Sequence, residues 1–407
     1  MTRKSGGTDL DIFDKCMNFT RAKEAMEQGI YPYFKPIREN HGPRVVMDGK
    51  EIIMIGSNNY LGLTKDPRVQ EAAIKAIEKY GTSCSGSRFL NGTLELHEEL
   101  ERKLAAFVNK EAALCFSTGY QSNLGAISTI LSKDDIIITD KTNHASIFDG
   151  IFLSAGIHMG ATIKRYKHND MEDLERVVSR LDPDKPKMVI TDGVFSMEGD
   201  LVKLPQMVEI AQKYHLRVYL DDAHGLGVEG KTGRGTQEHY NIWEEVDLLM
   251  CTFSKSFASL GGFISGKSEV VHYIKHHSRP LIFSAAIPPA NTAAVLKSLE
   301  IIQNEPQIVH RLQAIGKKMI REFQALGFDT GESQTPIVPI IIGDDTKTFL
   351  FWRMLFEAGI YTNPVISPAV PPDRALIRTS YMATHTDEDL DRVLETFKKI
   401  GKEMGLI

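Results

Sequence analysis

The 407-residue sequence has few cysteines and no extended apolar run, and each scarcity excludes a class of protein. Its four cysteines are scattered, without the paired spacing of a disulfide or zinc framework, so they indicate reduced thiols. No stretch approaches the roughly 18 consecutive apolar residues of a transmembrane helix. Residues 1–16 also lack the apolar segment of a signal peptide. We therefore expect a cytoplasmic protein; peripheral contact with the inner face of a membrane is compatible with this pattern.

Positive charge is also scarce. The sequence has 48 Lys and Arg against 53 Asp and Glu, a formal net charge of −5, and no long basic run. Nucleic-acid binding relies on basic patches, so we expect no nucleic-acid partner. With 42% apolar and 25% charged residues, the composition is that of an ordinary globular protein. The length predicts two domains, or one large and one small domain.

The middle of the chain alternates between short apolar strands and helical patterns. Helical stretches such as 171–181 and 205–215 separate the strands. The predicted strands are 112–116, 136–139, 162–166, 187–191, 217–220 and 246–250. This alternation predicts an α/β domain with a large, mostly parallel sheet over residues 46–285. Ligands of such sheets bind beyond the carboxyl ends of the strands, so those ends are the places to search for a site.

Two further segments flank this domain. Residues 1–45 read as a polar helix and a bend, followed by a strand pair with its turn at Asp48-Gly49. Residues 286–407 predict a smaller α+β domain. Its elements are helices 292–304, 308–326 and 346–358, a strand 337–342, a strand pair around Ile360 and 376–380, and a final helix from Asp387.

Lys255 stands out at the end of the last predicted strand of the α/β domain. Thr252 and Ser254 precede it, and small residues with a glycine pair follow it. A lysine among apolar neighbours has a lowered pKa and can form a Schiff base with an aldehyde. The two hydroxyls can bind an anion beside it. The alternative for this stretch alone is a surface lysine in a serine-rich loop.

Polar side chains follow the other strand ends. Residues 117–125, after strand 112–116, read as a glycine-containing turn that opens a helix. The first N–H groups of this helix can bind a phosphate, or the stretch is a plain strand–helix turn. No dinucleotide or nucleoside-triphosphate motif occurs here. His144 can stack on a flat ring, act as acid or base, or be structural. Ser196 is either a hydrogen-bond donor or a turn residue.

Asp221 and Asp222 follow strand 217–220, with His224 two residues later. Two adjacent carboxylates are costly to bury without partners, so we expect one to bind a functional cation and the other to face solvent or an arginine. A metal site of these three residues is the alternative. No further cluster of carboxylates or histidines completes its ligand shell, so we predict no metal. Taken together, the strand ends supply the lysine, the acid and the phosphate cradle that pyridoxal 5′-phosphate needs.

Several motifs reinforce this prediction. They are GSNNYLGL (56–63), GSRFLNGT (86–93), HEELE (97–101), NHASIFDG (143–150), DGVFSMEGD (192–200), DDAHGLGV (221–228) and TFSKSFASLGGF (252–263). From about residue 30 to the end, the chain resembles the α-oxoamine synthases, fold-type I pyridoxal-phosphate enzymes that condense an amino acid with an acyl-CoA and release CO2. The form of the lysine motif and MATHT (382–386) resemble the serine palmitoyltransferases within that family.

The resemblance implies a role for each cofactor-side residue. Lys255 would bond the cofactor aldehyde and later serve as acid and base. Asp221 would pair with the pyridine nitrogen, while His224 and Ser196 would contact the phenolic oxygen. His144 would stack on the ring, orient the substrate carboxylate and assist the reaction.

The resemblance also assigns the phosphate contacts. Gly119 and Tyr120 would bind the phosphate through backbone N–H groups, and Thr252 and Ser254 through hydroxyls. Ser284 would reach the phosphate of the partner subunit, since this family builds its site at a homodimer interface.

On the substrate side, Asn59 and Ser87 match family positions, and Arg378 matches the arginine that grips the amino-acid carboxylate. The sequence departs from the family in one place. Some serine palmitoyltransferases carry a second arginine about a dozen residues earlier, whereas residues 365–372 contain none.

The implied reaction joins L-serine to a long-chain acyl-CoA, palmitoyl-CoA, giving 3-ketodihydrosphingosine, CoA and CO2, the first step of sphingolipid synthesis. Rivals within the family are 2-amino-3-ketobutyrate ligase, which uses glycine, and 8-amino-7-oxononanoate synthase, which uses alanine. A non-catalytic partner subunit is the alternative of a different class, and the presence of Lys255 argues against it.

Overall fold

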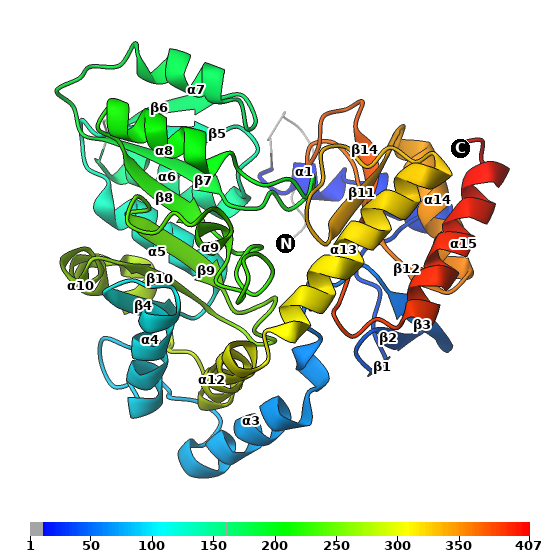
Figure 1. Ribbon diagram of the computed structural model, residues 1–407, viewed down its shortest axis with the longest axis horizontal. Coiled ribbons are helices and arrows are strands. Elements are labelled where there is room, and N and C mark those ends of the chain that lie inside the picture. Colours follow the sequence, from blue (N-terminus) through cyan, green and yellow to red (C-terminus); the bar gives the residue numbers. More distant parts are fainter. Residues whose placement is uncertain (1–10, 159–160) are drawn as a thin grey trace, which may run out of the picture.

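The computed structural model describes residues 11–158 and 161–407 (Figure 1). A seven-stranded sheet occupies one part of the molecule, and a three-stranded and a four-stranded sheet lie in the other. The long helix α13 (Gln307–Leu326) runs between them. The predicted α/β architecture with a large and a small part is confirmed.

The large sheet has the strand order β4-β10-β9-β8-β7-β5-β6. Only β10 runs antiparallel to its two neighbours, so the sheet is mostly parallel, as predicted. The strands are β4 (Ala112–Phe116), β5 (Ile136–Asp140), β6 (Thr162–Tyr166), β7 (Lys187–Asp192), β8 (Arg217–Asp221), β9 (Leu248–Thr252) and β10 (Gly262–Gly266). Every residue of β5, β9 and β10 is buried, as expected for strands covered on both faces.

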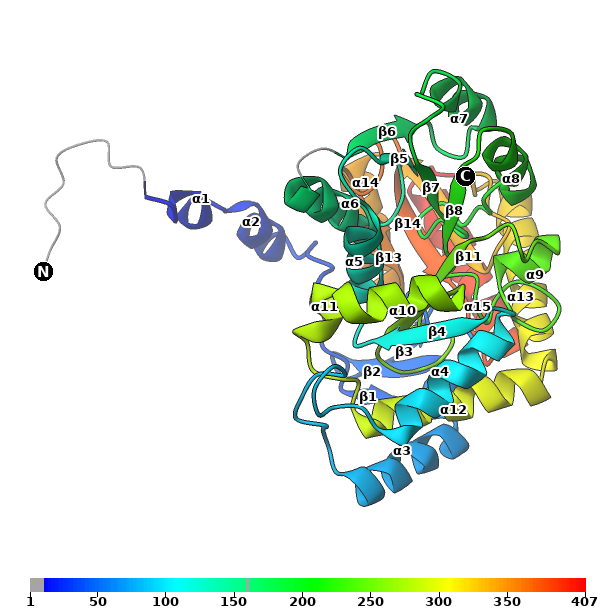
Figure 2. The same cartoon turned by 90° about the vertical axis from the view of Figure 1, so that its left-hand side faces the viewer.

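Helices connect these strands and cover the sheet (Figure 2). They are α4 (Glu95–Phe107), α5 (Gly119–Ile130), α6 (Ala145–His158), α7 (Met171–Val178), α8 (Leu204–Lys213), α9 (Thr236–Tyr240), α10 (Ser268–His277) and α11 (Arg279–Ile282). The helices predicted at 171–181 and 205–215 correspond to α7 and α8, with ends that differ by at most three residues.

The sequence pattern missed β10 and placed β9 two residues too early. Strand β10 has a glycine at each end and few apolar residues between them, which weakens the sequence pattern typical of a strand. The glycines are needed for close packing. A Cβ at Gly262 would come within 2.7 Å of the Gly119 Cα atom, at the start of α5. Because β9 ends at Thr252, the following loop carries Lys255 beyond the sheet edge.

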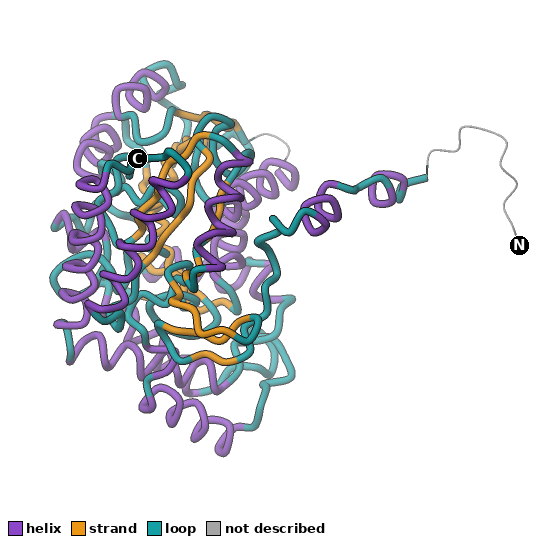
Figure 3. The backbone as a smooth tube through the Cα atoms, turned by 90° about the vertical axis from the view of Figure 1, so that its right-hand side faces the viewer, coloured by secondary structure: helices purple, strands orange, loops and turns teal. Residues whose placement is uncertain are grey.

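The N-terminal segment has two short helices, α1 (Asp14–Met17) and α2 (Arg21–Glu27), on an arm that leads away from the rest of the chain (Figures 2 and 3). It then enters the sheet β1 (Glu39–Asn40), β2 (Arg44–Met47) and β3 (Lys50–Met54). The predicted turn at Asp48-Gly49 is confirmed. Both residues have positive φ, 48° and 75°, as the tight hairpin turn requires.

The C-terminal part contains the second core of the molecule. Its elements after α13 are β11 (Ile337–Gly343), α14 (Asp345–Glu357), β12 (Ile360–Tyr361), β13 (Asn363–Val365), β14 (Ala375–Ser380) and α15 (Asp387–Glu403). The pairing predicted between Ile360 and strand 376–380 is wrong. The chain changes sheets at Thr362: β12 pairs with β3, and β13 pairs with β14. Ile360 joins Ile53 of β3 in one apolar core, which draws β12 to that sheet.

Helices on the two sides of the predicted domain boundary at residue 285 pack against each other. Helix α12 (Pro289–Asn304) packs on α3 (Pro67–Tyr80), and Val295 and Leu299 belong to the large core. A short 3-10 helix, Leu63–Lys65, precedes α3. The division into 1–45, 46–285 and 286–407 remains a prediction.

We predict that Phe263→Ala lowers the free energy of unfolding by about 3–5 kcal/mol, because it empties a buried ring site in β10. The ring is fully buried and stacks on Phe253 at 5.6 Å. Phe34→Ala is the matched control. Its ring is 94% exposed, so the change should stay within about 0.5 kcal/mol. Urea unfolding of both variants at one protein concentration measures this. Equal effects would contradict the assignment of Phe263 to the core.

Candidate active site

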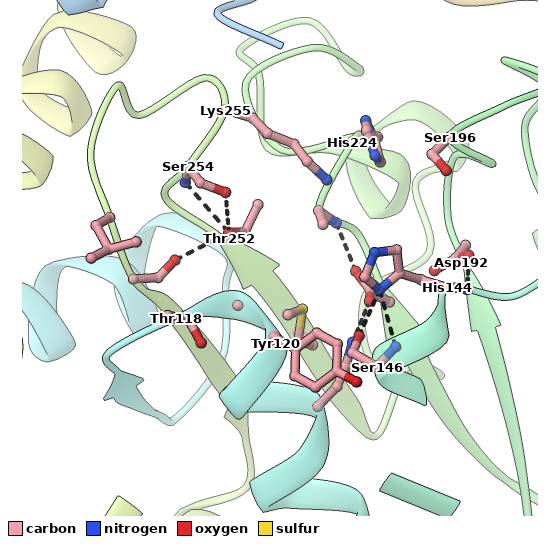
Figure 4. A pocket seen from close by; sticks show the side chains of 17 residues that line it. Thr118, Tyr120, His144, Ser146, Asp192, Ser196, His224, Thr252, Ser254 and Lys255 are labelled. Atoms are coloured by element: carbon pink, nitrogen blue, oxygen red, sulfur yellow. Dashed lines mark hydrogen bonds between the residues drawn. The ribbon is translucent and has the colours of Figure 1, made fainter. Parts of the chain in front are cut away.

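A cavity of about 260 Å³ opens at the carboxyl ends of the large sheet's strands (Figure 4). Five sequence-distant segments contribute to it, which follows from the meeting of parallel strand ends at one sheet edge. It is lined by Thr118, Gly119, Tyr120, Asn123, His144, Ser146, Asp192, Ser196, Asp221, Ala223, His224, Met250, Thr252, Ser254, Lys255, Leu260 and Gly261. Most of the residues predicted on the cofactor side lie in this set.

The Lys255 side chain extends into this cavity toward His224 (Figure 4). Removal from bulk water lowers the pKa of its amine to about 8, although Asp221 and Asp192 act in the opposite direction. Roughly a tenth of the amine is therefore uncharged at pH 7, far more than for an ordinary lysine, and this is the form that attacks an aldehyde.

Asp221, the last residue of β8, is buried on the cavity floor with only 3% of its surface exposed. Its Oδ2 atom accepts a hydrogen bond of 2.6 Å from Asn123 Nδ2, and its Oδ1 atom accepts one of 3.0 Å from the Ala223 N–H. Asn123 is itself oriented by the Tyr219 hydroxyl, which donates to its Oδ1 at 2.8 Å. These donors hold the carboxylate in one position and replace the hydrogen bonds to water that burial removes.

His144 lies in the loop before α6. Its Nδ1 atom is 2.7 Å from Ser146 Oγ, and its backbone N–H donates to Asp192 Oδ2 at 2.9 Å. Burial lowers the pKa of its imidazole; Asp221 raises it and Lys255 lowers it. The ring is therefore neutral at physiological pH and offers a flat face to a planar ligand.

A second network links the large sheet to the C-terminal part. The Tyr60 hydroxyl is 2.7 Å from His224 Nδ1, and the buried Arg378 donates to the Ser196 carbonyl at 2.5 Å and to Asn58 Oδ1 at 3.0 Å. Burial, together with Lys255 and Arg378, lowers the pKa of His224 well below its ordinary value. His224 is thus a neutral ring with one nitrogen fixed by Tyr60.

The opposite end of the cavity is suited to an anion. Helix α5 begins there, with Thr118 as its N-cap accepting from the Gln121 N–H at 3.1 Å. The first N–H groups of this 12-residue helix, at Gly119 and Tyr120, lie beside the hydroxyls of Thr252 and Ser254, which are 2.9 Å apart. A Cβ at Gly119 would come within 2.6 Å of Thr252 Oγ1, so only glycine leaves this corner open.

Four predicted residues lie outside the cavity lining. Ser284 Oγ accepts from Gln121 Nε2 at 2.9 Å. Arg378 donates to Ser196 of the lining and also contacts Tyr60, which lies outside the lining and is bonded to His224. Asn59 faces a different cavity, where it donates to Thr64 Oγ1 at 2.8 Å. Ser87 is buried, and its hydroxyl has no hydrogen-bond partner in the described part of the chain. The roles of these residues remain predictions.

Asp222 differs from its predicted surroundings, because it faces neither solvent nor an arginine. It is fully buried, and its carboxylate accepts from both the N–H and the hydroxyl of Thr236. Burial raises its pKa to about 7. Gly225 and Gly235 leave room for it. Asp222 therefore ties down loop 222–236, which carries His224.

Across residues 11–158 and 161–407, no group of three or more His, Cys, Asp or Glu is placed to hold a metal ion.

The sequence pattern did not single out four residues that line or support the cavity: Tyr60, Asn123, Ser146 and Asp192. Asp192 had a usable signal, since it ends strand β7 in the same way that Asp221 ends β8. Asn123 was hidden because it reaches the site from the second turn of a helix.

Comparison with known proteins identifies the class of this chain. Residues 50–397 match the aminotransferase class I and II family, and the chain belongs to that family.

Within this class the chain is similar to serine palmitoyltransferases, as the motifs implied. The serine palmitoyltransferase of Bacteroides thetaiotaomicron is 48% identical over 394 residues, which cover 97% of this chain and 99% of the relative. An 8-amino-7-oxononanoate synthase of Thermoanaerobacter pseudethanolicus is 44% identical, covering 98% and 99%. A solved structure of serine palmitoyltransferase from S. paucimobilis, with a bound PLP–myriocin aldimine, has a TM-score of 0.93 at 33% identity and covers 98% of this chain and 100% of its own.

The lowered pKa of Lys255 predicts how its reactivity depends on pH. Because the amine loses its proton near pH 8, reductive alkylation by a small aldehyde should rise about tenfold from pH 7 to pH 9 and then level off. Peptide mass spectrometry of the cofactor-free protein measures the rate. A lysine-containing peptide in the same solution is the reference, and its rate should keep rising beyond pH 9. A Lys255 rate that parallels this peptide would contradict a lowered pKa.

Proposed function

We propose that this protein is a serine palmitoyltransferase. It joins L-serine to palmitoyl-CoA and releases CoA and CO2, giving 3-ketodihydrosphingosine, the first intermediate of sphingolipid synthesis. The observation that carries this proposal is the single cavity in which Lys255, Asp221, His144 and the anion site at α5 meet. Near-full-length similarity to serine palmitoyltransferases supports the choice of substrates.

The cavity residues fit pyridoxal 5′-phosphate. The N-terminus of α5 with Thr252 and Ser254 suits its phosphate, and the carboxylate of Asp221 suits a protonated pyridine nitrogen. His144 offers the flat face of a neutral ring, and Lys255 supplies the amine that would hold the aldehyde. When bound, this cofactor supplies an electron sink that stabilises negative charge on the substrate Cα atom.

The remaining chemistry falls to the side chains around the cavity. The amine of Lys255 removes the proton from the serine Cα atom and later returns a proton, which a pKa of about 8 allows in both directions near neutral pH. His224 and Ser196 face this amine across the cavity and would orient the phenolic oxygen of the cofactor. His144 orients the substrate carboxylate by hydrogen bonding.

Arg378 is the residue that would bind the carboxylate of serine. Its guanidinium group is buried and held by the Ser196 carbonyl, Asn58 and Tyr60, so its position is fixed before substrate arrives. Arg374, four residues earlier, lines a separate cavity beside Asp200 and does not supply the second arginine missing from 365–372. In this proposal one arginine therefore binds the carboxylate.

The active form would be a homodimer, with Ser284 contacting the phosphate in the partner's site. In support, Ser284 lies outside the cavity lining of its own chain. Its hydroxyl accepts a hydrogen bond from Gln121, the third residue of α5. The exposed apolar side chains Phe13 and Phe19 on the N-terminal arm would also gain partners in a dimer. We place the enzyme in the cytoplasm, with peripheral contact at the inner membrane face for its long-chain substrate and product. None of the helices that the structure describes is long and apolar enough to span a bilayer.

One second candidate has a specific observation in its favour. The 44% identity to an 8-amino-7-oxononanoate synthase supports alanine and a pimeloyl thioester as alternative substrates. The 2-amino-3-ketobutyrate ligase reaction, with glycine, rests on the family motifs alone. A non-catalytic partner subunit would not need Lys255.

A substrate comparison tests the proposal. We expect the purified, cofactor-loaded enzyme to release CoA from palmitoyl-CoA with L-serine at least about tenfold faster than with glycine or L-alanine, and to prefer palmitoyl-CoA to acetyl-CoA and pimeloyl-CoA. Because one tenfold step is about 1.4 kcal/mol, one or two well-placed contacts suffice for this preference. Lys255→Ala should abolish turnover. Preference for alanine with the pimeloyl thioester would replace the proposal with its rival, and cofactor binding without any turnover would favour the partner-subunit alternative.

Arg378→Lys tests the carboxylate site. A lysine keeps the charge but loses the two-pronged hydrogen bonding, so we expect the KM for serine to rise about tenfold or more while the KM for palmitoyl-CoA stays within about twofold. Arg374→Lys is the matched control and should leave both values unchanged. Steady-state kinetics with each substrate varied in turn provide the measurement. Equal increases in both KM values would show that Arg378 acts on the fold rather than on serine.

A further inference from the structure

The cavity contains a second buried carboxyl group, which the proposed function leaves without a role. Asp192 ends β7 as Asp221 ends β8, and the two residues are register partners in these neighbouring parallel strands. Partners in register point to the same face of a sheet, so both carboxyl groups face the cavity that they both line. Asp192 is 6% exposed and Asp221 is 3% exposed.

The two carboxyl groups are held unequally. Asp221 accepts hydrogen bonds on both oxygens, from Asn123 Nδ2 at 2.6 Å and from the Ala223 N–H at 3.0 Å. Asp192 accepts one from described residues, from the backbone N–H of His144 to its Oδ2 atom at 2.9 Å. Because N–H donors stabilise the charged form of a carboxyl group, Asp221 is the better-stabilised anion of the pair.

The charges around Asp192 also disfavour a second anion. The titratable groups that act on Asp192 come from the elements around it: Asp140 of the neighbouring β5, Tyr166 of β6 beyond β5, Asp221 of the neighbouring β8, His144 and Lys255. Of these, Lys255 is the one cation, and Asp221 already shares it. Burial and the neighbouring Asp221 raise the pKa of Asp192 well above its ordinary value. A second negative charge on Asp192, next to the Asp221 carboxylate and out of water, is therefore unfavourable.

We propose that Asp192 is a positioning residue that keeps the proton of this carboxyl pair, so that Asp221 alone is charged, and that fixes His144 through its backbone N–H. This inference rests on the proposed function, because it concerns how the chain receives the cofactor. A protonated Asp192 leaves one negative charge for the pyridine nitrogen. With Asp192 uncharged, the Lys255 amine also has one anion beside it rather than two. A second anion would favour the charged form of the amine.

Infrared spectroscopy of the loaded protein tests the protonation directly. Asp192→Asn keeps the shape and an acceptor oxygen for the His144 N–H but has no carboxyl group. We expect the difference spectrum of the parent protein minus Asp192→Asn at pH 7 to show the carbonyl band of a protonated carboxyl group. The matched difference with Asp221→Asn should show the bands of a charged carboxylate. Asp222 is another buried acid, and burial raises its pKa to about 7, so both pairs are also compared in an Asp222→Asn background.

Cofactor retention provides the second readout. On dialysis, Asp192→Asn should hold pyridoxal 5′-phosphate within about threefold of the parent protein, Asp192→Ala should lose it at least about tenfold more readily, and so should Asp221→Asn. Cofactor retention in Asp192→Asn together with its loss in Asp192→Ala would show that His144 needs a hydrogen-bond acceptor at this position and that the acceptor need not be charged.

The inference is overturned if Asp192→Asn removes a carboxylate band, or if it loses the cofactor as readily as Asp221→Asn does. Should Asp192→Asn fail to fold, the parent protein in an Asp222→Asn, Glu198→Gln background decides, because burial raises the pKa of both replaced acids and a protonated band must still persist at pH 7 there. Neither readout needs turnover, so a protein that binds the cofactor but rejects serine would contradict the proposed function and leave this test intact.

Discussion

The structure depends on keeping the Asp221 carboxylate charged in a place from which water is largely excluded. A buried charge of this kind is stable only when donors compensate for its lost hydration. Asn123 and the Ala223 N–H supply that compensation, and the Tyr219 hydroxyl fixes Asn123 in turn. The chain thus builds a stationary negative charge at the end of β8, toward which a cationic ring nitrogen can bind.

Lys255 is the counterpart of that charge, and its position comes from β-sheet geometry. Strand β9 ends at Thr252, and the antiparallel β10 returns beside it from Gly262. The loop between them holds the lysine over the strand ends, where partial burial lowers the pKa of the amine to about 8. The same glycine-lined corner lets α5 approach closely enough to present its N-terminus to an anion. One piece of backbone therefore positions both the Lys255 amine and the anion site proposed for the phosphate.

Much of this arrangement could be predicted from the sequence. Parallel strands end at the same edge of a sheet, and the residues that follow each strand can be read directly from the chain. The alternation of strands and helices predicted the mostly parallel sheet. The polar residues after the strand ends predicted that Lys255, His144 and Asp221 would lie together. Three features could not be predicted. The glycine-rich strand β10 lacked a recognisable pattern. Strand β12 has only two residues, so its choice of partner depended on the apolar core around Ile53. Arg378 meets Ser196 because the C-terminal part packs against the large sheet, and Tyr60 meets His224 although 164 residues separate them in the chain.

The central claim is that Lys255 is the one lysine that bonds the cofactor. Borohydride reduction of the loaded protein followed by proteolysis and peptide mass spectrometry tests it most directly, because reduction makes the bond between amine and cofactor permanent. The structure predicts that the added mass of pyridoxal phosphate lies on the peptide that contains Lys255, in a ratio of about one per chain. Cofactor mass on another lysine, or none on Lys255, would contradict this account.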